Sequence, residues 1–128
     1  WNETVKEYMK QKKVSYTIAA YSCGELFFPQ KFPKNSKNIS IPIIGFAAEC
    51  DNKDVEKCIK QVMAEEEIIE RDFLIRQMPE ITAAGGKRDL LMDCKDVSFK
   101  EIDGETMELQ FFLGKGSYAT MVVKQLFG

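Results

Sequence analysis

The stretch Met107-Glu108-Leu109-Gln110-Phe111-Phe112-Leu113-Gly114-Lys115-Gly116-Ser117-Tyr118-Ala119-Thr120 contains two kinds of hydrophobic periodicity. Apolar and polar residues alternate from Met107 to Leu113, apart from Phe112, and this alternation predicts a half-buried strand. From Ser117 to Phe127 the apolar residues recur at helical spacing, and Ser117 is a suitable N-cap. The two intervening glycines permit backbone turns that other residues resist. The stretch therefore predicts a strand, a glycine turn and a helix.

The rest of the chain is expected to mix hairpins and helices. Asp103-Gly104 is a strong hairpin signal that joins the strand above to one over residues 97–102. Further strands are expected over 14–20, 26–28 and 88–94, with an extended segment over 41–46 in which Pro42 suits a sheet edge. Helices are expected over 1–12, from a cap at Asp51 or Asn52 to about residue 65, and over 68–75. This mixture predicts an α+β fold.

The bulk composition is that of an ordinary globular domain. The chain has 128 residues, of which 45% are hydrophobic and 30% are charged. No apolar run approaches the roughly 20 residues that span a bilayer, and the N-terminus lacks signal-peptide character. We therefore expect no membrane partner and a cytoplasmic location.

The reactive side chains exclude several kinds of chemistry. The chain has no histidine, so it cannot supply a Ser-His-Asp or Cys-His mechanism by itself. Its four cysteines have no zinc-type spacing and are expected to be buried reduced thiols. The sequence therefore predicts no metal site.

The charge is distributed unevenly along the chain. The net charge is −2, but residues 1–48 are basic and residues 49–70 are strongly acidic. The acidic block would repel a phosphate backbone and should face away from RNA. The simpler explanation of the same block is an ordinary solvated helix face.

The run Gly116-Ser117-Tyr118-Ala119-Thr120 resembles the C-terminal motif of the TruD family of tRNA pseudouridine synthases. That family has a strand, this motif and then a helix that usually continues as Arg-Glu-Leu; here Lys124, Gln125 and Leu126 occupy those positions. The resemblance implies that Ser117, Tyr118, Ala119 and Thr120 form a wall of the active site. It also implies that Lys124 supports the catalytic aspartate, although lysine lacks the bidentate fork of arginine. A well-capped helix with no such role is the alternative.

Two other segments are similar to the same family. Gly85 and Arg88 match a Gly-x-x-Arg element, and Ile41-Pro42-Ile43-Ile44-Gly45 is similar to a Leu-Pro-Leu-Pro-Gly segment. The resemblance and the local charge together predict an RNA-binding set, which comprises Arg76, Lys87, Arg88 and Lys115. An exposed turn and an ordinary helix surface are the alternatives for these cations.

The resemblance also implies a domain arrangement and a missing part. Residues 1–95 would belong to the inserted TRUD domain, and residues 96–128 would return to the pseudouridine synthase catalytic domain as its last strand and helix. The family's catalytic aspartate lies in an N-terminal motif, and none of the seven aspartates here has that context. The chain starts at Trp1-Asn2, similar to a family helix cut through its middle.

We therefore expect an intact enzyme that isomerises a uridine of tRNA, in the D-arm region according to the resemblance. Its partners would be tRNA and the remaining N-terminal part of the same protein, and this chain alone would be inactive. The alternative is a non-catalytic α+β module that binds RNA or another protein.

Overall fold

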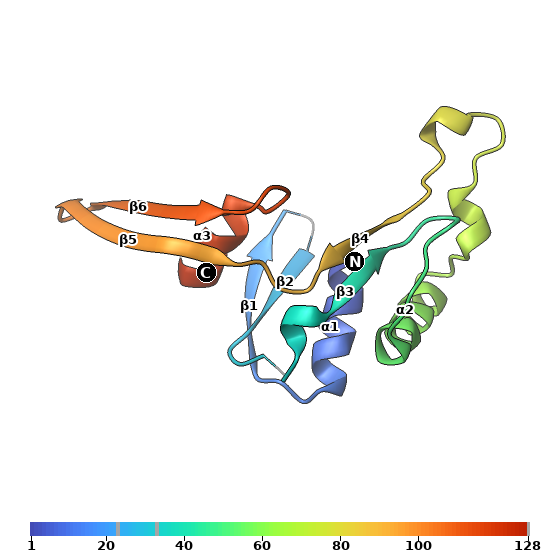
Figure 1. Ribbon diagram of the computed structural model, residues 1–128, viewed down its shortest axis with the longest axis horizontal. Coiled ribbons are helices and arrows are strands. Elements are labelled where there is room, and N and C mark those ends of the chain that lie inside the picture. The colour runs from blue at the N-terminus through green and yellow to red at the C-terminus, as the bar shows by residue number, and fades with distance from the viewer. Residues whose placement is uncertain (23, 33, 128) are drawn as a thin grey trace. The chain divides into compact units, whose positions relative to one another are not determined.

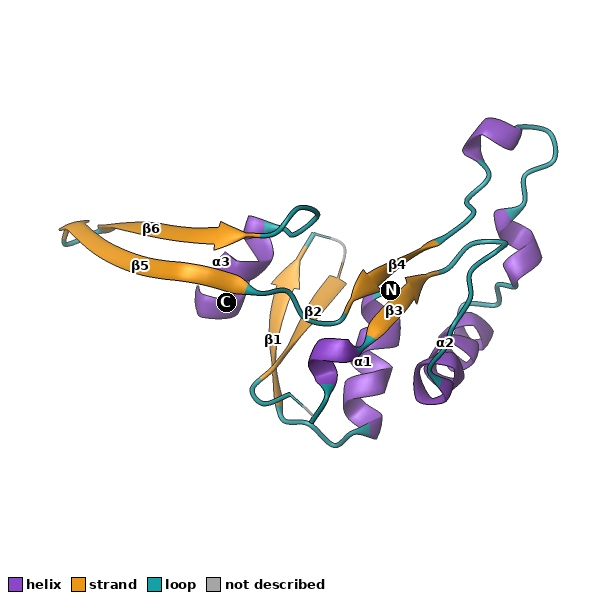
Figure 2. Ribbon diagram, viewed as in Figure 1, coloured by secondary structure: helices purple, strands orange, loops and turns teal. Residues whose placement is uncertain are grey.

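The computed structural model describes residues 1–22, 24–32 and 34–127, and it has the expected α+β composition. These residues form three α-helices, three 3-10 turns and three antiparallel sheets of two strands each (Figures 1 and 2). The chain divides into two compact units, Trp1–Leu90 and Leu91–Gly128. The expected domain boundary at residues 95/96 falls inside a strand and stays a prediction.

The core of the first unit lies between α1 (Asn2–Gln11), α2 (Lys53–Glu65) and β3 (Ser40–Ile43). Its buried members come from all three elements: Tyr8, Met9, Ile41, Val55, Cys58 and Ile59. The N-cap of α2 is Asn52, whose side chain accepts hydrogen bonds from the N–H groups of Asp54 (3.0 Å) and Val55 (3.2 Å). Such a cap contributes about 1 kcal/mol of helix stability. One of the two predicted caps is thus confirmed.

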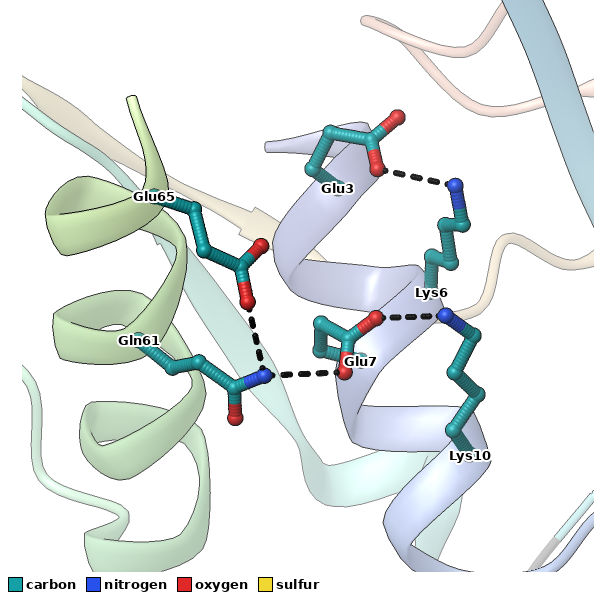
Figure 3. Close-up of polar contacts among 6 residues, drawn as sticks. All are labelled: Glu3, Lys6, Glu7, Lys10, Gln61 and Glu65. Atoms are coloured by element: carbon teal, nitrogen blue, oxygen red, sulfur yellow. Dashed lines mark hydrogen bonds and ion pairs between the residues drawn. The ribbon is translucent and has the colours of Figure 1, made fainter. Parts of the chain in front are cut away.

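Polar side chains join α1 to α2 along their exposed edge (Figure 3). The Gln61 amide donates to Glu7 at 3.3 Å and to Glu65 at 3.0 Å. Glu7 also accepts a bond of 2.7 Å from Lys10. Glu65, one of the acidic residues of α2, therefore has a hydrogen-bond partner within the fold.

The strands β1 (Tyr16–Tyr21) and β2 (Gly24–Pro29) form a hairpin as expected. The predicted turn between them includes Cys23, which lies outside the described residues. Leu26 and Phe28 point to the buried face, because alternate residues of a strand share a side. The hairpin thereby presents one apolar face within the first unit.

Two of the sequence-based elements differ from the structure. The helix expected over residues 68–75 is a single 3-10 turn, Glu70–Phe73, and its apolar neighbours Ile69 (59% exposed) and Leu74 (40%) remain in solvent. Short helices depend on burial of one face, so an unburied segment does not extend the turn. The strand expected over 88–94 is instead β4 (Gly86–Asp89), which pairs with β3 only as far as Ser40↔Asp89. One further backbone bond, from the Leu90 N–H to the Ile39 carbonyl at 2.9 Å, continues this contact, and the chain then bends at Leu90 and leaves residues 91–93 without a strand partner.

The second unit contains the expected terminal hairpin and helix. Its elements are β5 (Cys94–Asp103), β6 (Thr106–Leu113) and α3 (Ala119–Phe127). The Asp103 carboxylate accepts a hydrogen bond of 3.0 Å from the Glu105 N–H, which supports the predicted turn. Across the described residues, no helix combines the length and apolar character that crossing a membrane requires.

Candidate active-site wall and basic surfaces

A tight turn connects β6 to α3. The Ser117 N–H donates to the Gly114 carbonyl at 3.2 Å, and Gly116 has a φ of 85°. A positive φ at the third position defines a type II turn, and glycine adopts it without steric cost. The spacing of the two glycines is therefore explained by backbone geometry, and Lys115 is left exposed at the second position of the turn.

The helix begins after the predicted position. α3 starts at Ala119, two residues beyond Ser117, and its first turn includes a 3.1 Å bond from the Met121 N–H to the Tyr118 carbonyl. Ser117 is half-buried, whereas Tyr118 is 57% exposed and Ala119 and Thr120 are exposed. The first N–H groups of a helix lack intrahelical partners and attract anions. The four residues predicted to form a wall therefore lie at the N-terminal end of α3, with Lys115 nearby in sequence.

The predicted apolar face of α3 is only partly covered. Val122 is buried and Met121 and Lys124 are half-buried, while Tyr118 and Leu126 (46%) are exposed. Val122 is the sole buried side chain among the described residues of the second unit. The helix therefore keeps uncovered apolar side chains at both ends.

The β5–β6 ribbon also has one apolar face. The register places Phe99 opposite Leu109 and Glu101 opposite Met107, and Phe111 and Leu113 follow on the same side of β6. The opposite side carries polar pairs, Ser98 with Gln110 and Lys100 with Glu108. Phe99 and Met107 are each 54% exposed, and Phe112, which breaks the alternation, is 63% exposed. The Met107 side chain, which the alternation predicted to point into a core, is therefore exposed in this chain.

The predicted RNA-binding cations of β4 are both engaged inside the first unit. Lys87 donates to Asp51 at 2.7 Å, and this hydrogen bond raises the pKa of the lysine. The Arg88 guanidinium lies over the Trp1 ring at 5.2 Å, within cation–π range. The indole N–H of Trp1 donates to the Ile41 carbonyl at 3.1 Å, opposite Arg88 in the sheet register. Arg88 therefore helps to hold Trp1 against the sheet, and its contact with RNA stays a prediction.

The structure brings together two segments that were singled out separately in the sequence. β3 pairs with β4, and just beyond them Phe46 and Ala47 donate to the carbonyls of Ala83 (2.9 Å) and Ala84 (3.2 Å). Gly45 is buried at this junction, where its backbone meets Gly85. The glycines of the two family-like segments are thus needed for close backbone approach.

Arg76 lies in a different part of the first unit. It lines a shallow, open pocket with Arg71, Asp72, Leu74, Ile75 and Gln77. This pocket is in the segment that connects α2 to β4, away in sequence from Lys87 and Arg88. Neither Lys87 nor Arg88 lines the pocket that contains Arg76. No three Asp, Glu or Cys side chains gather as a metal site within the described ranges.

Sequence reasoning overlooked a basic groove at the end of α1. Its lining residues come from two loops: Lys12, Lys13, Val14, Ser15, Gln30, Lys31 and Phe32. The signal was available, because six lysines and a single acid, Glu25, occur between Tyr8 and Ser40. What the sequence did not indicate was that residues 12–15 lie beside 30–32.

The cysteine prediction holds only in part. Cys58 is fully buried, Cys50 is half-buried and Cys94 is exposed, and Cys23 lies outside the described residues. Cys94 is exposed because it begins β5 at the edge of a two-stranded ribbon. Its thiol is therefore not one of the buried thiols that the sequence predicted.

Comparison with known proteins gives a consistent result. A family model described as tRNA pseudouridine synthase D (TruD) matches residues 6–126. A Thermococcus sibiricus protein named as a tRNA pseudouridine synthase D is 29% identical over 100 residues, covering 78% of this chain and 24% of that protein. A Methanopyrus kandleri protein of the same name is 30% identical over 89 residues, covering 70% and 22%.

A crystal structure of a Methanosarcina mazei protein with this name has the same fold. The TM-score is 0.54 at 20% identity, and the match covers 94% of this chain and 34% of that one. The chain spans about a quarter of the length of the curated relatives described above.

Proposed function

We propose, from the premise that this chain belongs to the tRNA pseudouridine synthase D (TruD) family, that it is part of an enzyme converting a uridine of tRNA to pseudouridine. In that reaction the bond from the ribose to N1 of uracil breaks and a bond from the ribose to C5 forms; C5 then loses its proton to solvent and N1 gains one, so the product is an isomer of the substrate. The target uridine must first leave the base stack, at a cost of a few kcal/mol. No cofactor is needed, and the natural compartment is the cytoplasm.

The observation that carries the proposal is the terminal strand, turn and helix. Gly116 occupies the positive-φ position of the turn, and Ser117 to Thr120 follow it at the start of α3. Exposed Tyr118 offers a ring beside helix N–H groups, a surface suited to a base and its phosphate. In the proposed enzyme these four residues form one wall of the uridine pocket.

The reactive carboxylate belongs to another part of the enzyme. The apolar face of the β5–β6 ribbon and the ends of α3 are uncovered, and Val122 is the one buried side chain in the described part of the second unit. Burial on this scale is too small to stabilise an independent domain. We assign this unit to the C-terminal edge of the catalytic domain, whose remainder brings the aspartate and covers Phe99, Met107 and Leu126.

Lys124 has the supporting role in this arrangement. It is half-buried in the last turns of α3, where a cation suits the helix dipole. Within the complete site it stands beside the aspartate and holds it ionised. Without this cation the developing charge at the aspartate loses its stabilising partner, so Lys124→Gln is expected to lower kcat about a hundredfold or more, which corresponds to about 2.7 kcal/mol of activation free energy.

The test uses a protein that joins this chain to the aspartate-bearing portion, with C5-tritiated unmodified tRNA as substrate. Tritium release is expected from this protein, and its kcat should fall in Lys124→Gln but largely persist in Lys124→Arg. Lys60→Gln, which removes an exposed lysine on α2, is the matched control. Failure of the joined protein to release tritium would contradict the proposed function.

A further inference from the structure

We propose that the groove at the end of α1 binds a single-stranded segment of RNA, with Lys13 and Lys31 contacting phosphates and Phe32 stacking on a base. The choice of RNA as ligand rests on the proposed function. The residues that line the groove include none of the four predicted RNA-binding cations, and all of them belong to the first unit.

A backbone hydrogen bond joins the two walls of the groove. One wall is the turn from α1 into β1, and the other is the segment that leaves β2 (Figure 1). The Gln30 N–H donates to the Ser15 carbonyl at 2.9 Å, which extends the β1–β2 ladder by one pair. The resulting open groove of about 370 Å³ lies within the range that small ligands occupy.

The three lysines of the groove differ in whether their ammonium groups already have partners within the protein. Lys12 is held by Asp54 at 2.6 Å and lies 5.4 Å from the centre of the Tyr8 ring. Lys13 and Lys31 are both exposed, and neither forms an ion pair with any other residue that the structure describes. These two ammonium groups are therefore available to an external phosphate.

The backbone at Lys13 has a left-handed conformation at the end of α1. Lys13 has a φ of 53°, and the bonds Lys13 N–H to Lys10 (2.9 Å) and Val14 N–H to Met9 (3.2 Å) form a Schellman motif. Glycine is the usual residue at this left-handed position, because a side chain there is sterically unfavourable. The motif fixes the point at which the Lys13 side chain leaves the backbone at the edge of the groove; Glu67 has the same conformation outside the groove, so the conformation alone assigns no function.

The aromatic side chain selects the form of the RNA. Phe32 is 41% exposed at the edge of the groove, next to Lys31. A base within a duplex has no free face for stacking, whereas a splayed-out base does. The Gln30 amide and the Ser15 hydroxyl add hydrogen-bonding groups that line the same groove.

The test measures the affinity of the 128-residue chain for oligouridylate and for an RNA duplex of equal length, as a function of salt. For single strands each phosphate contact contributes about 0.7 to the slope of log affinity against log salt. The double variant Lys13→Gln/Lys31→Gln should therefore reduce the slope by about 1.4. Phe32→Leu should weaken oligouridylate binding about fivefold or more and leave the slope unchanged.

The matched control is Lys53→Gln/Lys57→Gln, which removes the same charge from exposed positions on α2 and should leave the slope unchanged. Equal slopes for the two double variants would overturn the proposal, as would binding of the duplex or of oligoglutamate as tightly as oligouridylate. Lys31→Gln alone, in an exposed loop, replaces the double variant if that protein does not fold, and should reduce the slope by about 0.7. Because binding requires no aspartate, this outcome is independent of the tritium assay.

Discussion

Gly45 and Gly85 meet backbone to backbone beside the β3–β4 pair. A Cβ atom on Gly45 would collide with the amide nitrogen of Gly85 and the carbonyl oxygen of Ala83, and a Cβ on Gly85 would lie 2.7 Å from the Ile43 carbonyl. Both obstacles are main-chain atoms, which cannot move aside as a flexible side chain can. Two backbone segments 40 residues apart in the sequence can therefore pack this closely only because both positions are glycine.

Gly45→Ala should therefore destabilise the first unit by about 3 kcal/mol or more, because overpacking against backbone cannot relax locally. Gly86→Ala is the matched control, since its new Cβ would meet nothing within 4 Å. Denaturant unfolding followed by the fluorescence of Trp1 reports on this unit alone, because Trp1 is the only tryptophan and bonds to β3. Equal midpoints for the two variants would contradict the close approach.

Lys13→Gly is expected to raise stability while it weakens RNA binding. Glycine relieves the left-handed strain at the end of α1, a gain of roughly 0.5–1 kcal/mol, but removes a phosphate contact. Glu67 has a φ of 55° in the equivalent motif at the end of α2, outside the groove. Glu67→Gly should therefore give the same gain in unfolding free energy with unchanged oligouridylate affinity. A Lys13→Gly protein that binds the oligomer normally would speak against the groove.

The thiols should react at very different rates. Cys58 is fully buried, and burial raises its pKa from the ordinary 9.0, so little thiolate is present at neutral pH. Cys94 is exposed and should react with a thiol reagent as fast as a free cysteine. The raised pKa also means that stability from Cys58 is present below pH 9.0 and is lost as the pH rises through the folded value.

Mass spectrometry after timed labelling distinguishes the two sites. Cys58→Ser serves as the assignment control for the slow site. Rapid labelling of Cys58 in native protein would show that the core between α1 and α2 opens far more easily than its packing indicates.

Local signals in the sequence were sufficient for most of the fold. Asn52 and the apolar spacing after it predicted α2, and Asp103-Gly104 predicted the β5–β6 hairpin, because caps and turns depend on neighbouring residues. The predictions for residues 68–75 and 88–94 were wrong because these segments extend as a helix or strand only where another part of the chain packs against them or pairs with them. A helix without a surface to cover and a strand without a partner both look normal in a sequence window.

The candidate sites divide in the same way. The turn at Gly116 could be predicted from the motif, because a positive φ is a local property. The pairing of Gly45 with Gly85, the use of Lys87 by Asp51 and the groove beside Lys13 all depend on long-range contacts. Charge counting indicated a basic N-terminal region but could not indicate which lysines were already paired.

The central claim is that this chain supplies a scaffold and one wall of an RNA-modifying site, and that the catalytic carboxylate lies elsewhere. The direct measurement is tritium release from C5-tritiated unmodified tRNA incubated with the 128-residue chain alone, with tRNA binding recorded in the same sample. We predict salt-dependent binding with no release of tritium above background. Release of tritium by the isolated chain would contradict the account, because a catalytic aspartate would then have to be among the seven it contains.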